Sequence, residues 1–399
     1  MQHNFDEIVN RQGTDSIKWK AFPADILPMW VADADFKSPA PMLEALEERV
    51  RHGVFGYMMS DQTVREAAAH WLTSRHNWPV TPDQVAFSPS VEHTLTQMAE
   101  VFTAPGENIL FLTPAYPPFF TTTKNKGRNV VGSPLRLVKG ADGAYNYQVD
   151  YDDLEAKMAL PATRLLILCN PHNPTGRAWS REELLKIGEL CEKHNILVVA
   201  DEIHSDFVFG KAHLPFATLS PELARRTLTA ISPSKTFNTA ALQTSAVVSL
   251  NPHLLARFRS AVSKAALDPP VLGALAMQVA YTRCGYYADQ AAVYIRANQE
   301  FAVKFINDEV PGLAAYLPEA TYLLWLDCRA LMQKLALPAD AAGQAGLMEF
   351  FLNKAKVALN SGIDYGGDAI GFVRLNAACP RVMLLDGLNR LKNATVAVN

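Results

Sequence analysis

The chain has 399 residues, of which 49% are hydrophobic and 19% are charged. This composition can bury a large core, which excludes a disordered protein, and the length is sufficient for two domains. Lys and Arg total 37 against 40 Asp and Glu, giving a net charge of -3, and this near balance argues against a nucleic-acid-binding surface.

The five cysteines are widely spaced and form no C-x-x-C pair. That pattern is typical of a reduced protein, and it indicates neither a disulfide framework nor a metal site. The first residues, MQHNFDEIVNRQG, carry charges where a signal peptide needs an apolar run. Apolar runs such as LLILC (165–169) are too short to span a membrane. We therefore expect a cytoplasmic protein with neither nucleic acid nor membrane as a partner.

The first half of the chain alternates strand-like and helix-like segments. A short strand over 85–90 precedes a helix over 91–102. A second strand over 164–170 is followed by a helix over 180–195 and by a buried strand over 196–201, with another strand over 227–231. Strand, helix, strand in this order predicts right-handed crossovers between parallel strands, and hence an α/β fold with a largely parallel sheet.

The pattern changes after about residue 285. Helical segments over 294–310 and 346–359 surround strand-like runs over 321–327 and 371–376. We predict a large domain over 49–285 and a smaller α+β domain over 286–399, with the N-terminal segment 1–48 contributing to the smaller one.

Polar clusters follow the predicted strands at their carboxyl ends. In an open parallel sheet these ends meet at one edge, where ligands bind. The clusters are Ser88 and Ser90, Asn173, Asp201, and Ser232 with Ser234 and Lys235.

The residue types in these clusters suit one cofactor. Ser90 at a helix N-terminus can hold a phosphate, and Ser232 and Ser234 can add donors. Asp201, at the end of a very apolar strand, needs a cationic partner. Lys235, desolvated or close to other cations, would have a lowered pKa and so a neutral amine able to form a Schiff base. A phosphate, a protonated ring nitrogen and an imine-forming lysine together describe pyridoxal 5′-phosphate (PLP).

Four motifs carry a family resemblance. NPHNPTG (170–176), ADEIHSD (200–206), SPSKTFN (232–238) and FVRLNAACPR (372–381) resemble fold-type I PLP enzymes of the aspartate aminotransferase superfamily. DEIHSD, together with HGVFGY (52–57) and VADADF (31–36), resembles the MalY/PatB branch, the cystathionine β-lyases or C–S lyases. The resemblance implies a mostly parallel seven-stranded sheet between helices, a smaller α+β domain, and a homodimer.

The resemblance also implies a role for each site residue. Lys235 would form the imine with the cofactor and later remove the substrate Cα proton. Asp201 would pair with the pyridinium nitrogen, and Tyr116 would stack on the ring. Asn173 would contact the phenolic oxygen and the substrate, beside His204, which stands where many relatives have tyrosine.

The remaining roles concern the cofactor phosphate and the substrate carboxylate. By the same resemblance, the phosphate would be held by Ser90, Val91, Ser232 and Ser234, and by Tyr57 from a second subunit. Arg374 would bind the substrate α-carboxylate as a bidentate fork. Many aminotransferases have an arginine eight positions after the lysine to meet the phosphate. This chain has Gln243 there.

Each residue also has a simpler interpretation in isolation. Lys235 could be a surface charge, Asp201 a helix N-cap, Arg374 a structural ion pair, and His204 a core histidine. Asp33 and Asp35 are expected to shape a loop near the site, and GGDAIG (366–371) is expected to be structural.

The predicted activity is cleavage of L-cystathionine or a related cysteine S-conjugate by β-elimination. Two alternatives stay open. One is an aminotransferase with the same cofactor and fold. The other is a PLP-containing regulatory protein that acts by binding a partner.

Overall fold

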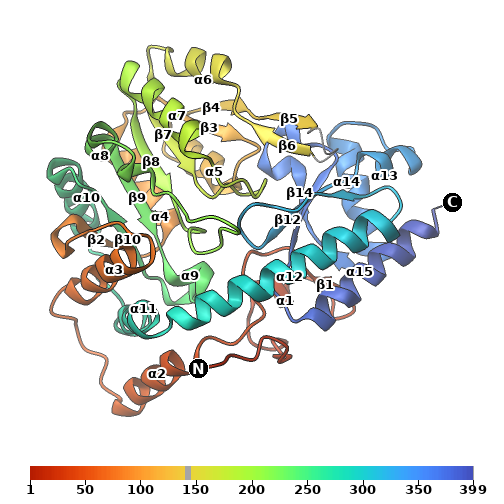
Figure 1. Ribbon diagram of the computed structural model, residues 1–399, viewed down its shortest axis with the longest axis horizontal. Helices are drawn as coiled ribbons and strands as arrows, with labels where there is room; N and C mark the ends of the chain where they lie inside the picture. The colour runs from red at the N-terminus through yellow and green to blue at the C-terminus, as the bar shows by residue number, and fades with distance from the viewer. Residues whose placement is uncertain (140–144, 399) are drawn as a thin grey trace.

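A seven-stranded sheet forms the centre of the protein (Figure 1). The structure is a computed structural model that describes residues 1–139 and 145–398. The strands lie in the order β2 (Val85–Ser88), β10 (Ser245–Val248), β9 (Thr227–Ile231), β8 (Leu197–Asp201), β7 (Thr163–Cys169), β3 (Asn108–Thr113) and β4 (Asn129–Pro134).

All but one of these strands run in the same direction. Strands β4, β3, β7, β8 and β9 pair in parallel, whereas β10 is antiparallel to both β9 and β2. Strand β2 therefore runs with β9, and its carboxyl end lies at the same edge. The predicted largely parallel sheet is confirmed.

Both faces of the sheet are covered, and the alternation of side chains along β7 shows this. Leu165 and Ile167 belong to one hydrophobic cluster, and Leu166 and Leu168 belong to another. The first cluster includes helices α3 (Gln62–Arg75), α4 (Val91–Phe102), α10 (Pro252–Lys264), α11 (Val271–Arg283) and part of α12 (Gly285–Glu309). The second includes α6 (Tyr151–Met158), α7 (Arg181–Lys193) and α8 (Pro221–Arg226).

Helix starts follow the predicted signals. Ser180 and Glu183 form the capping box of α7, because each side chain satisfies a free backbone N–H of the other. Ser90 caps α4 in the same position. These caps fix where each helix begins after its strand.

A four-stranded antiparallel sheet lies beside the large one (Figure 1). Its order is β11 (Ala314–Ala315), β12 (Leu323–Asp327), β15 (Phe372–Asn376) and β14 (Asn360–Ser361). It packs in a third hydrophobic cluster with the second half of α12, with α14 (Ala341–Phe350) and with α15 (Arg381–Val396). Leu27 and Met29 of the N-terminal segment belong to this cluster. The division of the chain into domains stays a prediction.

The expected helix over 346–359 is wrong at its C-terminal end. Helix α14 ends at Phe350, a π-helical turn follows over Phe351–Ala355, and Lys356 adopts a left-handed conformation with φ 56°. The next residues form strand β13 (Val357–Ala358), which pairs in parallel with β1 (Leu27–Pro28). The partner strand lies near the other end of the chain, so local periodicity could not reveal it.

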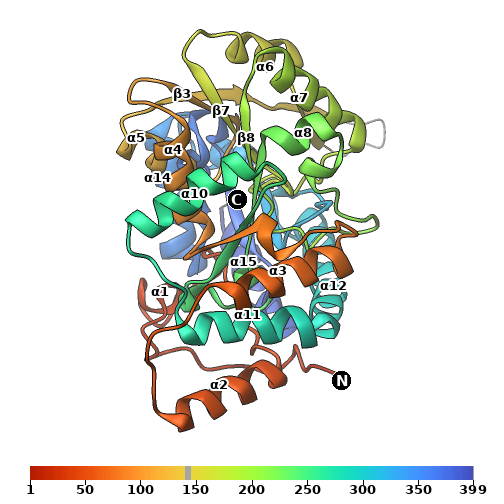
Figure 2. The same cartoon turned by 90° about the vertical axis from the view of Figure 1, so that its left-hand side faces the viewer.

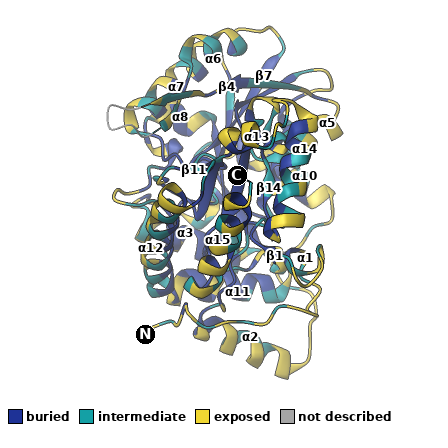
Figure 3. Ribbon diagram, turned by 90° about the vertical axis from the view of Figure 1, so that its right-hand side faces the viewer, coloured by how far each residue is buried: buried dark blue, intermediate teal, exposed yellow. Residues whose placement is uncertain are grey.

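The remaining helices and strands connect or flank these sheets. Helix α2 (Ala40–His52) and the segment after it project from the body and are largely exposed (Figures 2 and 3). The others are α1 (Ile17–Lys20), α5 (Pro117–Asn125), α9 (Pro233–Thr236), α13 (Arg329–Lys334) and the antiparallel pair of β5 (Arg136–Lys139) with β6 (Tyr145–Gln148). All five cysteines are buried and free. Among the described residues, none of the helices is both long and apolar enough to cross a membrane.

Candidate active site

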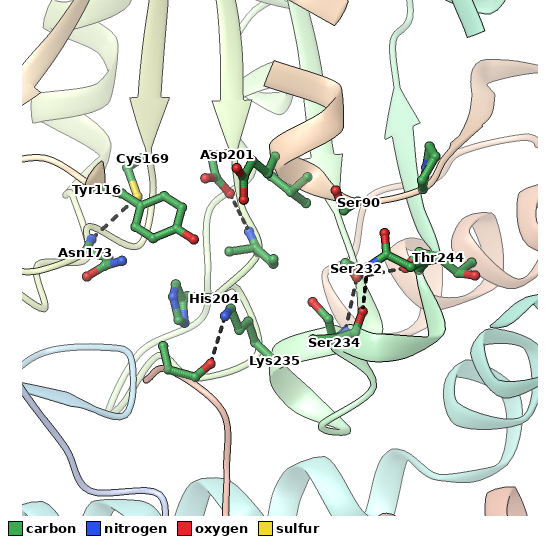
Figure 4. Close-up of a pocket in the computed structure, with 17 residues that line it drawn as sticks. Ser90, Tyr116, Cys169, Asn173, Asp201, His204, Ser232, Ser234, Lys235 and Thr244 are labelled. Atoms are coloured by element: carbon green, nitrogen blue, oxygen red, sulfur yellow. Dashed lines mark hydrogen bonds between the residues drawn. The ribbon is translucent and has the colours of Figure 1, made fainter. Parts of the chain in front are cut away.

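A cavity of about 210 Å³ opens at the carboxyl edge of the large sheet (Figure 4). It brings together residues that lie far apart in the chain, as parallel strands predict. The predicted site residues that line it are Ser90, Val91, Tyr116, Asn173, Asp201, His204, Ser232, Ser234 and Lys235.

Lys235 lies in the single turn of α9, directly after β9. Its Nζ donates a hydrogen bond of 2.8 Å to the backbone oxygen of Ala32. Burial and the charge of Arg374 lower the pKa of the Lys235 amine to about 8, against the opposing effect of Asp33 and Asp201. A substantial fraction of this amine is therefore neutral near physiological pH.

Asp201 is the last residue of β8, and its side chain is buried. Burial raises the pKa of this carboxyl to about 6. Its Oδ1 accepts one hydrogen bond, from the Ile203 N–H at 3.2 Å, and the charge of Lys235 gives some further stabilisation. A buried carboxylate with so few partners needs a cation, and the cavity is where one can reach it.

The His204 ring packs edge-to-face against Tyr322, with 5.5 Å between the ring centroids. Burial, together with the cationic side chains of Lys235 and Arg374, holds the pKa of this imidazole well below its usual value. The ring is thus neutral. Its Nδ1 is buried and has no hydrogen-bond partner in the described part of the chain, so it is available to a bound group.

The N-terminus of α4 forms an anion cradle. The Ser90 hydroxyl accepts a hydrogen bond from the His93 N–H at 3.0 Å, which leaves its own proton free for a ligand. Val91 and Glu92, in the first turn, also line the cavity. Backbone N–H groups at this position point out of the helix and bind phosphate well.

The two serines of α9 differ in what they can offer. Ser232 donates to the Thr244 backbone oxygen at 2.9 Å and accepts from the Ser234 N–H at 3.1 Å, so its hydroxyl caps the turn. The Ser234 hydroxyl makes no hydrogen bond within the residues that the structure describes. Of the two hydroxyls, Ser234 is the one available to a phosphate. Gln243 also lines the cavity but supplies no charge.

Arg374, on β15 of the smaller sheet, lies behind the cavity lining and contacts one of the lining residues, Asn173. Its Nη1 donates to Asn173 Oδ1 at 3.0 Å. Its Nη2 donates to the Trp30 backbone oxygen at 3.0 Å and to Asn360 Oδ1 at 2.7 Å. Its Nε is buried and, in the described structure, unpartnered. Three of its five N–H donors are used in this way, so Nε–H and one hydrogen on Nη1 are left for a carboxylate.

The segment over residues 30–36, here called the N-terminal strap, crosses the site. Its backbone oxygens at Trp30 and Ala32 accept hydrogen bonds from Arg374 and Lys235. Asp35, fully buried, anchors the strap by accepting from Arg11 at 2.7 Å and from Lys18 at 2.6 Å. Asp33 also pairs with Arg11, at 2.7 Å. Both aspartates thus hold a loop next to the site, as their expected role requires.

Two predicted site residues are not in the cavity lining. Arg374 lies behind it, bonded to Asn173, whereas Tyr57 is fully exposed. The sequence interpretation also missed several residues. These are Ala32, Glu92, Cys169 and Thr244 in the lining, and Tyr322 and Asn360 behind it. The VADADF motif was the one signal for Ala32. The other contacts arise from residues that the fold brings together and carry no local pattern.

Comparison with known proteins identifies the family. The model of the aminotransferase class I and II family matches residues 32–389. The chain belongs to this family. Within it, the chain is 41% identical to cystathionine beta-lyase PatB of Bacillus subtilis (strain 168), over 98% of this chain and 99% of that protein. The predicted resemblance to the MalY/PatB branch is confirmed.

Solved structures of the aminotransferase class I and II family agree in fold. A PLP-bound putative aminotransferase from Clostridium difficile 630 superposes with a TM-score of 0.92 at 36% identity, over all of both chains. A PLP-bound C–S lyase from Staphylococcus hominis has a TM-score of 0.90 at 29% identity, over 99% of each chain. The predicted fold class, the fold-type I architecture, is confirmed.

The donor set of the cavity fits PLP. The α4 N-terminus and the Ser90 and Ser234 hydroxyls can bind a phosphate. Asp201 forms no ion pair with the residues that the structure describes, although the charge of Lys235 acts on it, and a pyridinium nitrogen would supply a direct cationic partner. Lys235 presents an amine that is neutral often enough to react with an aldehyde.

Proposed function

We propose that this chain is a PLP-dependent C–S β-lyase that cleaves L-cystathionine or a related cysteine S-conjugate to a thiol, pyruvate and ammonia. One observation carries the proposal. A chain 41% identical to a cystathionine β-lyase along nearly its whole length has a buried lysine amine and a buried carboxylate around one cavity. Arg374 is bonded to a third lining residue, Asn173.

Bound PLP withdraws electrons from the substrate Cα and so makes its proton acidic. Lys235 takes that proton, because its amine has a pKa of about 8 and is partly neutral near physiological pH. Arg374 would bind the α-carboxylate through the two N–H donors that have no partner among the described residues, while Asn173 holds the guanidinium in place. This orients the Cα–H bond toward Lys235.

The other lining residues hold the cofactor. Ser90, Val91 and Ser234 bind the phosphate, and Ser232 supports them by capping the turn that carries Ser234. Asp201 would pair with the ring nitrogen, Tyr116 would stack on the ring, and Asn173 and neutral His204 would contact the phenolic oxygen. The cavity is buried among these side chains, which limits water access to the reacting atoms.

A second copy of the chain completes the site in this proposal. Tyr57 is fully exposed, and its neighbours Val54, Phe55 and Met59 are exposed apolar side chains on the projecting segment after α2 (Figure 2). Such a patch suits burial against a partner. The assembly is a cytoplasmic homodimer in which Tyr57 reaches the partner's phosphate cradle. Light scattering on the purified protein tests the dimer, and a monomer at micromolar concentration would refute it.

Pyruvate release from L-cystathionine with no keto acid present tests the activity. We expect pyruvate and a free thiol in equal amounts, and the Lys235→Ala variant should release neither. Borohydride should reduce the cofactor onto the wild-type chain at Lys235 alone. A covalent adduct of the same yield in Lys235→Ala would show that a different lysine reacts.

An aminotransferase is the second candidate, because the family model and a PLP-bound putative aminotransferase at 36% identity both carry that description. In that case product would appear only when a keto acid is supplied, and that keto acid would be consumed. A PLP-loaded protein with neither activity would favour the regulatory role.

A further inference from the structure

The last residue of the ADEIHSD motif, Asp206, has no part in the proposed chemistry, although its carboxylate is almost fully buried. It lies in the loop after β8, a short distance along the chain from Asp201. Burial of a charge at this depth is costly unless hydrogen bonds compensate for it. The hydrogen-bond partners of Asp206 therefore indicate which part of the structure the buried charge stabilises.

Asp206 accepts hydrogen bonds from four side chains. Three reach Oδ1 from α3 and the residue after it, namely Trp71 Nε1 at 3.2 Å, Arg75 Nε at 3.0 Å and His76 Nε2 at 3.0 Å. The fourth is the Thr236 hydroxyl, which donates to Oδ2 at 2.6 Å. Burial opposes ionisation of this carboxyl, but His76 and Arg75 outweigh it and hold the pKa of Asp206 down to about 2. Both of its oxygens are therefore acceptors throughout the physiological range.

Thr236 is the residue that directly follows Lys235. Helix α9 is a single turn of four residues, so it has little rigidity of its own. Within this turn, Ser232 caps the start by accepting from the Ser234 N–H at 3.1 Å. The Thr236 hydroxyl bond fixes the other end. The backbone of Lys235 is thereby held between two anchors.

The oxygens of Asp206 tie this end of α9 to a much larger element. Helix α3 has fourteen residues, and its Trp71 packs flat on Tyr281 of α11 at 4.8 Å between ring centroids. Arg75 also bonds to Asp289 of α12 at 2.8 Å. These contacts thus fix the Lys235 backbone relative to the helices that cover the large sheet.

We propose that Asp206 and Thr236 are a positioning pair that sets where the Lys235 amine lies. The inference rests on the proposed role of Lys235 in the PLP-dependent reaction. Neither residue touches the reacting atoms. Their effect is on the geometry of the lysine, so loss of the bond should slow steps that need the amine while leaving the carboxylate site of Arg374 intact.

Thr236→Val and Thr236→Ser form the central test. Valine keeps the shape of threonine but cannot donate to Asp206, whereas serine keeps the hydroxyl and loses only a methyl group. We expect Thr236→Val to lower kcat for the holoenzyme about tenfold with KM within about twofold of wild type, and Thr236→Ser to stay within about twofold in both.

Thr227→Val is the matched control. Thr227 lies at the other end of β9, is fully buried, and donates to the Leu223 backbone oxygen at 2.7 Å. This control should lose stability to urea much as Thr236→Val does, and yet keep its kcat within about twofold of wild type.

A second measurement does not depend on turnover. After removal of the cofactor, the full chain is mixed with PLP, and the rate of covalent attachment is followed by absorbance and by borohydride trapping. This attachment joins the PLP aldehyde carbon to the Lys235 nitrogen and releases one water. We expect Thr236→Val to attach PLP about tenfold more slowly, with Thr236→Ser and Thr227→Val within about twofold of wild type.

Three outcomes would refute the proposal that Asp206 and Thr236 position the Lys235 amine. Thr236→Val could match wild type in attachment rate, Thr236→Ser could fall as far as valine, or Thr227→Val could slow attachment equally. A wild-type protein that attaches PLP at Lys235 but releases no pyruvate would refute the lyase function alone, because the attachment rates still measure the pair.

Discussion

Replacing Asp201 with asparagine should stabilise the cofactor-free protein while destroying its activity. The carboxyl is buried, and its pKa is about 6 in the folded state against an ordinary value of 3.8. Because the pKa is higher in the folded state, the carboxyl loses its proton at a lower pH in the unfolded chain than in the folded protein. Stability from this group is therefore greatest at low pH, and it is lost as the pH rises from about 4 to about 6.

The magnitude follows from the size of the shift. A difference of roughly 2 pKa units destabilises the fold by about 3 kcal/mol at about pH 7.5, where the carboxyl is ionised in both states. At about pH 4.5 the carboxyl is ionised mainly in the unfolded chain, and the cost is only about 1 kcal/mol. The amide of the asparagine would keep an oxygen for the Ile203 N–H and carry no charge. Asp201→Asn should thus be more stable than wild type by up to about 3 kcal/mol at about pH 7.5.

Urea unfolding of both proteins at the two pH values measures this difference. Asp206→Asn is the matched control, because Asp206 is equally buried but has a pKa lowered to about 2. Its ionised form stabilises the fold above about pH 4, so this variant should lose roughly 2 kcal/mol at about pH 7.5. Added PLP should raise the urea midpoint of wild type more than that of Asp201→Asn. An Asp201→Asn protein that is less stable than wild type at the higher pH would refute the reasoning.

Three further variants have defined outcomes. Arg374→Lys loses the fork geometry of the guanidinium, so kcat/KM should fall roughly 100-fold, mostly because KM rises. For an amine substrate analogue without the carboxylate, the kcat/KM values of the variant and of wild type should differ far less. The Tyr322 hydroxyl donates at 2.8 Å to the Ala32 backbone oxygen, which also accepts from Lys235, so Tyr322→Phe should lower kcat about fivefold. Tyr287→Phe loses a similar bond, to the Lys37 backbone oxygen, and should leave kcat unchanged. Gln243→Arg should bind PLP about tenfold more tightly at low salt, with a smaller gain in high salt; equal gains at both would argue against a charge effect.

The sequence alone determined much of the large sheet. Strand β9 and helix α4 have the predicted bounds, and β7, α7 and β8 agree within two residues. These segments combine strong hydrophobic periodicity with local caps, which act within a few residues. Because the carboxyl ends of parallel strands meet at one edge, the sequence was sufficient to predict that four residues share one cavity, namely Ser90, Asn173, Asp201 and Lys235.

The tertiary structure decided what each of these residues contacts. Ala32 holds the Lys235 amine from 203 positions away, and Asn360 holds Arg374 across two paired strands. The serines of α9 look alike in sequence, yet Ser232 is used as a cap and Ser234 is free for a ligand. The strand at 357–358 exists because β1 lies beside it. Except for the bond between Ser232 and Ser234, these outcomes depend on partners outside the local segment, and such contacts leave no periodic signal in the residues themselves.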